Sequence, residues 1–189
     1  SSSTLNALKA AFELGSDVDV LVAGQSCEGA VKQAAAVAGV RKVLVAQGEA
    51  FNHCLPEALT DAVLAAQQAG GYSHILFTAG TSGKAAMPRT AAKLGVSALT
   101  EIAGVISADT FKRYIYAGGV LATVKTTATP VVASVRATSF EAVSAEGGNA
   151  AVETLAVTPS SRGFKFVSVE EVASDRPDLL TAKRVVAGG

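Results

Sequence analysis

The residues best suited to bind a ligand form a glycine-rich loop at positions 78–84 (Thr-Ala-Gly-Thr-Ser-Gly-Lys). The loop follows an apolar stretch and precedes a helical pattern, so its backbone amides could hold an anion at a helix amino terminus. Its spacing departs from a Walker A loop, because Thr78 replaces the first glycine of that motif and Ala85 replaces its Ser or Thr. We therefore expect a tight turn that caps a helix, with an anion or partner contact through Lys84 as the alternative.

Other candidate residues give weaker signals. Gly24-Gln25-Ser26 lies where a strand would turn into a helix, but a single glycine there is a weak sign of dinucleotide binding. Lys112 and Arg113 form the clearest basic pair, which suits either a solvated sheet edge or contact with an acidic partner. Carboxylates such as Glu101 and Asp109 show no spacing that indicates a paired acid and base. The sequence thus predicts no catalytic residue, no cofactor-binding residue and no metal ligand.

The cysteines and histidines also suggest structural roles. Cys27 and Cys54 are too few and too unpatterned for a disulfide framework or a zinc site. Apolar residues flank both cysteines, so we expect two small buried thiols. His53 and His74 are isolated, and no pairing of nucleophile and base can be assembled around them. This argues against a small hydrolase.

Composition narrows the class of protein. The 189 residues are 49% hydrophobic and only 17% charged, against a usual charged share of about 25%. Much of the apolar content is Ala and Val, which suits small-residue helices packed on a buried parallel sheet. Sixteen basic residues balance sixteen acidic ones, so no global field favours nucleic acid or anionic lipid. No apolar stretch approaches the ~20 residues that span a bilayer, and we expect no membrane insertion.

These side chains must be positioned by elements that alternate along the first half of the chain. Helical spacing of apolar residues predicts helices over 4–14, 27–38, 55–69 and 84–94. Apolar runs between them predict strands over 17–23, 41–46 and 74–77. Strands separated by helices of this length imply parallel pairing through right-handed crossovers. The expected class is α/β, with a doubly wound and mainly parallel sheet.

The pattern changes after Gly95, where strand-like segments follow one another without helices. They cover residues 102–107, 111–117, 120–126 and 131–137. Gly118-Gly119 is a good two-residue hairpin turn, so we expect antiparallel hairpin strands added to the parallel sheet. Residues 144–161 are rich in Gly, Ser, Ala and Thr, and we expect a loose segment. Residues 164–169 alternate and are predicted to return to the sheet, and 183–187 are predicted to form a further strand.

Several stretches, in this order, resemble the alpha subunit of electron transfer flavoproteins. They are residues 4–6 leading to 21–24, residues 39–46, Gly83-Lys84 with 87–94, residues 109–118, residues 135–140, and residues 175–179 with 183–189. Each stretch alone is a weak match, but the series runs over almost the whole chain and is specific. The fold implied is that of the adenine nucleotide alpha hydrolase-like, Rossmann-like proteins.

The resemblance implies a function that composition alone does not. Proteins of this family are alpha–beta heterodimers that carry FAD, with AMP in the beta subunit. They are electron carriers of fatty acid beta-oxidation, which take electrons from acyl-CoA and related dehydrogenases and pass them to a membrane quinone oxidoreductase. The flavin sits mostly in the carboxy-terminal domain of the alpha subunit, so no FAD contact is expected here. The implied role is a scaffold that docks on the beta subunit, in the mitochondrial matrix or the bacterial cytoplasm.

The same resemblance divides the chain and exposes two departures. Residues 1–172 correspond to the amino-terminal domain, and residues 173–189 to the junction and first strand of the FAD-binding domain, truncated here. Tyr114 replaces a proline or threonine of the family. The family's opening strand should precede the first helix, whereas this sequence starts at that helix. Because a lost strand leaves backbone groups unpaired, we expect something to occupy or distort its place.

A second hypothesis is a stand-alone adenine-nucleotide-binding module. A doubly wound sheet ends its strands at a natural ligand crevice. In that case residues 78–84 and 24–26 would contact the phosphates.

Overall fold

The computed structural model describes residues 2–160, 163–170, 177, 179 and 182–188. Its first part contains α1 (Ser2–Leu14), β1 (Val18–Gly24), α2 (Glu28–Ala35), β2 (Val40–Gln47), α3 (Pro56–Gly70), β3 (His74–Thr78) and α4 (Thr81–Leu94). Its second part contains β4 (Ala98–Ser107), β5 (Thr110–Ile115), β6 (Val120–Lys125), β7 (Val131–Val135) and β8 (Ala151–Thr154). Three short 3-10 turns are η1 (Glu49–Phe51), η2 (Tyr116–Gly118) and η3 (Ala137–Ser139). The predicted α/β class is confirmed.

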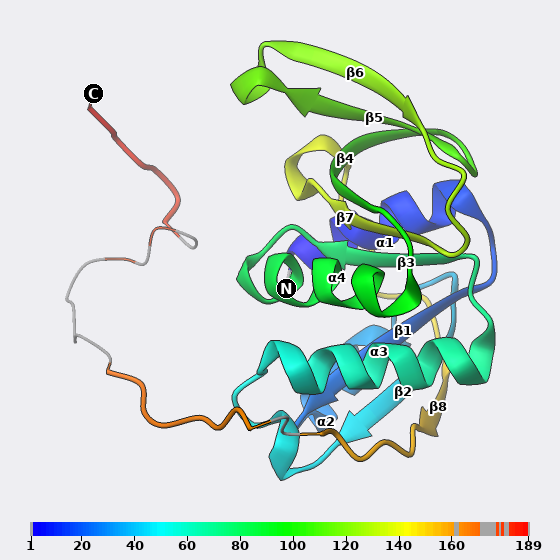
Figure 1. The fold of residues 1–189 in the computed structure, drawn as a ribbon, viewed down its shortest axis with the longest axis vertical. Helices are drawn as coiled ribbons and strands as arrows, with labels where there is room; N and C mark the ends of the chain where they lie inside the picture. The colour runs from blue at the N-terminus through cyan, green and yellow to red at the C-terminus, as the bar shows by residue number, and fades with distance from the viewer. Residues whose placement is uncertain (1, 161–162, 171–176, 178, 180–181, 189) are drawn as a thin grey trace.

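The strands form two sheets instead of the single sheet expected from the sequence (Figure 1). One has the order β1-β2-β8, with both neighbouring pairs parallel. The other has the order β3-β7-β4-β5-β6. In it β7 lies parallel between β3 and β4, and the antiparallel β5 and β6 extend the edge. The predicted hairpin addition is therefore present.

Helices cover both faces of the sheets, which makes the fold doubly wound. Leu8 of α1 packs with Cys27 beside α2 and with Val43 and Val45 of β2. On the other face the small residues of α3 pack on Ala46 of β2. In the second sheet α1 covers one face and α4 covers the other. Ala10 of α1 and Met87 of α4 accordingly belong to separate core clusters. Covered on both faces, β2 carries the continuous buried run Val43–Ala46 typical of a parallel sheet.

Glycines end two of these helices in the left-handed conformation. Gly71 follows α3 with φ 60° and Gly95 follows α4 with φ 69°. A residue with a Cβ is strained in this region, so glycine lets the chain reverse toward the next strand. The predicted helices over 55–69 and 84–94 end within one residue of these positions.

The hairpin turn begins earlier than predicted. Ile115 of β5 pairs with Val120 of β6, so four residues connect the strands instead of the two glycines alone. Tyr116 and Ala117 both have a positive φ, at 50° and 51°.

Three predictions for the second half are wrong. The segment 144–161 is not loose throughout, because it contains β8, which pairs with β2. Residues 164–169 contain no strand, and residues 183–187 contain none either. Alternating apolar residues make strand formation possible but supply no pairing edge. Residues 173–176 of the predicted junction lie outside the described residues.

Candidate functional site

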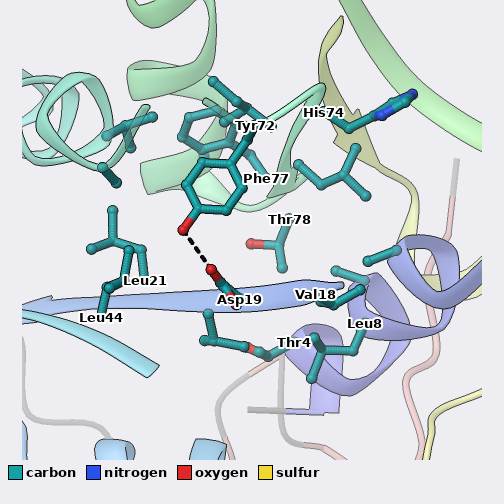
Figure 2. Close-up of a pocket in the computed structure, with 18 of the residues that line it drawn as sticks. Thr4, Leu8, Val18, Asp19, Leu21, Leu44, Tyr72, His74, Phe77 and Thr78 are labelled. Atoms are coloured by element: carbon teal, nitrogen blue, oxygen red, sulfur yellow. Dashed lines mark hydrogen bonds between the residues drawn. The ribbon is translucent and has the colours of Figure 1, made fainter. Parts of the chain in front are cut away.

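A cavity of about 690 Å³ lies between β1 and β3. The two strands form its opposite walls, α1 closes it on one face, and α3 and α4 close it on the other. Figure 2 shows the Tyr72 side chain reaching from the start of β3 toward Asp19 of β1, with Leu8 of α1 also lining the space. The lining is mainly aliphatic, so the cavity favours an apolar occupant.

The polar end of this cavity is a hydrogen-bonded group around Asp19. The Asp19 carboxylate, whose side chain is only 2% exposed, accepts bonds from Arg41 Nε at 2.8 Å and Arg41 Nη2 at 2.6 Å. The Tyr72 hydroxyl donates to the same carboxylate at 2.6 Å. Burial alone would raise the pKa of Asp19, but the bonds from Arg41 and Tyr72 outweigh it and hold that pKa below its usual value.

The residues of the cavity do not fit FAD. The pyrophosphate of a dinucleotide is commonly held by cationic side chains and by free amides at a helix amino terminus. Among the described lining residues the charged ones are Asp17 and Asp19, and neither Lys nor Arg is present. Asp17 carries a negative charge and Asp19 is already paired with Arg41, so these lining residues offer the pyrophosphate no positive charge.

The glycine-rich loop forms a tight connection between β3 and α4, as predicted. Gly80 caps the helix without a side-chain bond. A Cβ on Gly83 would lie 1.9 Å from the Thr78 carbonyl oxygen, so the helix start packs directly on the end of the strand. Lys84 Nζ lies 2.6 Å from Glu101 Oε1, which neutralises the lysine charge at this turn. The loop is thus explained by packing, and anion binding there stays an untested alternative.

Sequence reasoning missed the environment of Glu101. Glu101 lies in β4 with φ 52°, and its backbone N–H donates to the buried Ser134 hydroxyl of β7. The hydrogen bond from Lys84 is the main reason that the pKa of Glu101 is lowered. The Lys84–Glu101 ion pair joins helix α4 to strand β4 of the larger sheet. Spacing in the sequence gave no signal for it.

The β5–β6 hairpin and the adjoining end of β4, which together we call the arm (residues 106–125), expose apolar side chains. It projects from the end of the larger sheet, away from the helices (Figure 1). Its exposed members are Ile106, Tyr114, Tyr116, Val120 and Leu121, with Tyr116 being 83% exposed. The predicted basic pair lies on β5, where Lys112 is exposed and Arg113 is partly buried. Exposed apolar and tyrosine side chains beside a cation are typical of a protein interface.

The remaining candidates have structural environments. Cys27 is buried as predicted, whereas the prediction of a buried Cys54 is wrong. Cys54 is exposed because it lies in the turn between η1 and α3, with φ 50°. The His53 ring stacks on Phe166 with ring centroids 3.4 Å apart, and His74 Nε2 lies 2.7 Å from the Ala108 carbonyl oxygen.

The described residues contain neither a metal-binding cluster nor a membrane-spanning helix. Residues 2–160 and the later described stretches contain no group of three or more acidic, histidine or cysteine side chains that could hold a metal ion. No helix in the described part of the chain has the length and apolar character needed to cross a membrane.

Comparisons with known proteins identify the family. The family model for the electron transfer flavoprotein domain matches residues 1–160. The chain is 48% identical over 188 residues to the electron transfer flavoprotein subunit alpha of Pseudomonas aeruginosa, a match that covers all of this chain and 60% of the relative. It is 43% identical over 189 residues to the probable mitochondrial electron transfer flavoprotein subunit alpha of Caenorhabditis elegans, covering 98% of this chain and 56% of that relative.

A third relative gives the same result. The electron transfer flavoprotein subunit alpha of Paracoccus denitrificans is 43% identical over 186 residues, which cover 98% of this chain and 59% of the relative. The chain therefore spans less than two thirds of the length of these relatives. The match over residues 1–160, together with identities of 43% to 48%, shows that the chain belongs to the electron transfer flavoprotein family.

Proposed function

We propose that this chain is the amino-terminal domain of an electron transfer flavoprotein alpha subunit and that it serves as scaffold and docking surface for the beta subunit. The observation that carries the proposal is the exposed apolar arm, on a chain related to alpha subunits. The complete protein takes electrons from acyl-CoA and related dehydrogenases and delivers them to a membrane quinone oxidoreductase. It is an electron carrier and not an enzyme.

The cofactors belong to other parts of the assembly. FAD binds the carboxy-terminal portion of the alpha subunit, and AMP binds the beta subunit. The lining of the β1–β3 cavity supports this division, because its described residues include no Lys or Arg to bind a pyrophosphate. We place the domain at residues 1–172 and the start of the flavin domain at 173–189. Relatives named as mitochondrial and relatives from bacteria support the mitochondrial matrix or the bacterial cytoplasm as its location.

The arm has the chemistry of a subunit interface. Tyr114 and Tyr116 offer large amphipathic surfaces at low entropic cost. Arg136 lies over the Tyr114 ring, 4.7 Å from its centroid, and so holds that ring in place from outside the arm. Val120 and Leu121 are about half exposed on β6, whose outer edge no described strand covers. An apolar edge of this kind is stabilised when a partner covers it.

The docking surface is tested with two matched substitutions in the full-length alpha subunit, co-expressed with its beta subunit. Val120→Asp places a carboxylate on the arm, where Val120 is 46% exposed. Val152→Asp makes the same change on β8, where Val152 is 54% exposed and remote from the arm. We expect V120D to weaken heterodimer formation at least about tenfold, or about 1.4 kcal/mol, and V152D to leave it unchanged. Equal effects of the two variants would contradict docking through the arm.

The flavin spectrum tests the electron-carrier role separately. The wild-type heterodimer should show a bound flavin that an acyl-CoA dehydrogenase reduces in the presence of its substrate. A colourless heterodimer that binds AMP through residues 78–84 would instead favour the adenine-nucleotide-binding module. The ion pair of Lys84 with Glu101 counts against that alternative, because it leaves the lysine less available to a phosphate.

A further inference from the structure

Strand β4 brings several charged side chains together where it lies between β7 and β5 (Figure 1). Ile102 of β4 pairs with Arg113 of β5, and its carbonyl oxygen accepts a hydrogen bond from the Arg136 backbone N–H at 3.0 Å. Glu101, the preceding residue, forms the ion pair with Lys84 of α4. These four charged residues, which we call the arginine cluster (84, 101, 113 and 136), therefore surround one short segment of β4.

The arginine cluster carries more positive charge than its own carboxylate balances. Lys84 and Glu101 neutralise each other, with 2.6 Å between Nζ and Oε1. The hydrogen bond from Lys84 lowers the pKa of Glu101 most, and the charges of Arg136 and Arg113 lower it further, so all four groups interact. Within the described part of the chain, neither Arg113 nor Arg136 forms an ion pair. Two positive charges are left there without a counter-ion.

Arg113 is the less solvated of the two arginines. Its side chain is partly buried, and its Nε is buried with no hydrogen-bond acceptor among the described residues. Arg41 and Arg89 show the usual alternative, because each pairs with a carboxylate of this chain. A buried donor without an acceptor is unfavourable. The Arg113 guanidinium therefore lacks acceptors that another molecule could supply.

Arg136 is held in place by an aromatic ring and keeps its donors. Its guanidinium carbon lies 4.7 Å from the centroid of the Tyr114 ring. Stacking uses the face of a guanidinium and leaves the N–H groups at its edge free to bind an anion. Tyr114 follows Arg113 in β5 and belongs to the arm. The arginine cluster is therefore continuous with the apolar surface of the arm.

We propose that Arg113 and Arg136 bind an Asp or Glu carboxylate of the beta subunit when that subunit covers the arm. The inference rests on the docking proposed above and adds the ionic contact that orients the two subunits. Carboxylates and guanidinium groups form short, charge-assisted hydrogen bonds with a defined geometry. A free phosphate would leave Tyr114 and Tyr116 uncovered, whereas a protein carboxylate comes with a surface that covers them.

The first test measures heterodimer affinity with the full-length alpha subunit and its beta subunit. Arg113→Gln and Arg136→Gln should each weaken the heterodimer at least about tenfold. Lys32→Gln is the matched control, because Lys32 is an exposed cation of α2, away from the arm. It should leave the affinity unchanged. Sodium chloride should weaken the wild-type heterodimer, and this salt dependence should be smaller in both arginine variants.

The second test identifies the partner group and keeps the positive charge. Arg136→Lys places a primary amine in the cluster, and a carbodiimide joins an amine to an adjacent carboxylate with loss of water. We expect a cross-link from position 136 to an Asp or Glu of the beta subunit, identified by peptide mass spectrometry. The Lys32 amine should form no such cross-link. Because R136K retains the charge, it tests the contact even if a glutamine variant folds poorly.

The outcomes separate this contact from the docking surface. If V120D weakens the heterodimer while both arginine variants behave like K32Q, the carboxylate contact is overturned and docking through the arm stands. If V120D has no effect but the arginine variants weaken binding and the cross-link forms, the arm proposal fails and the contact is supported. If inorganic phosphate at constant ionic strength raises the melting temperature of the wild-type heterodimer and no cross-link forms, the site binds a free oxyanion and the proposal is overturned.

Discussion

The hydrogen bond from Tyr72 to Asp19 links the two sheets at one end of the cavity, and Tyr72→Phe removes it while keeping the ring. The Tyr72 ring packs closely on Gly70, where a Cβ would lie 2.4 Å from ring atom Cε2. Phenylalanine preserves that contact. The substitution therefore reports on the hydroxyl and leaves the packing of the aromatic ring unchanged.

The expected loss follows from the partners that remain. A hydrogen bond to a charged group stabilises a protein by about 1.5 to 3 kcal/mol. Two bonds from Arg41 still satisfy the Asp19 carboxylate, and Tyr72 is only partly buried. Both facts reduce the free-energy cost of removing the hydroxyl, so we expect Y72F to lower the free energy of unfolding by about 1.5 kcal/mol.

Urea unfolding at pH 7 measures this loss, and Tyr116→Phe provides the matched control. Tyr116 is 83% exposed and lies at the tip of the arm. Its substitution should change stability by less than about 0.5 kcal/mol. Equal losses in Y72F and Y116F, or a loss in Y72F below that limit, would refute the assignment of the hydroxyl as a link between the sheets.

The same link has a dependence on pH. Because the folded pKa of Asp19 is lowered, its contribution to stability is present above the unfolded pKa of about 3.9. It is lost as the pH falls through the lower folded value. Asp19→Asn should therefore remove part of the acid dependence of unfolding between pH 7 and pH 3, which urea titrations across that range measure. An unchanged acid dependence would contradict this pKa assignment.

Two further predictions concern single side chains. Gly83→Ala should destabilise the chain by at least about 2 kcal/mol, since the new Cβ would lie 1.9 Å from the Thr78 carbonyl oxygen. The control is Gly29→Ala in α2, where no atom lies within 4 Å of the new Cβ. This substitution should stabilise the chain by up to about 1 kcal/mol. Thermal unfolding compares the two variants, and an undisturbed G83A would show that the helix start is looser than described. Cys54 should react with a thiol reagent at least about tenfold faster than Cys27, because Cys27 is buried and burial raises its pKa. Reaction of both thiols at the same rate would contradict the packing of Cys27.

The helices and parallel strands were predictable because their signals are local. Apolar residues recur at helical spacing in α1 and α3, and Gly71 and Gly95 mark where α3 and α4 end. The continuous apolar run in β2 indicated a strand covered on both faces. Strand order was not predictable in this way. The insertion of β7 between β3 and β4 depends on pairing between distant segments.

The wrong predictions also have physical causes. All four residues of β8 are exposed, so the strand shows no apolar pattern and exists through its pairing with β2. Cys54 has apolar neighbours, but Pro56 starts α3 and leaves Cys54 in the preceding turn. The pairing of Lys84 with Glu101 follows from the packing of α4 beside β4 and has no signature in the spacing. The family resemblance supplied the function, which none of these local patterns contains.

Helix α1 carries a consequence for the cooperativity of folding. Leu8 belongs to the core of the smaller sheet, and Ala10, two residues later, belongs to the core of the larger one. This one helix therefore packs in both cores. If it detached from either sheet, apolar surface would be exposed in both. We expect the two sheets to melt in a single calorimetric transition. The first thirteen residues described, Ser2–Leu14, then make two separately hydrogen-bonded sheets one thermodynamic unit.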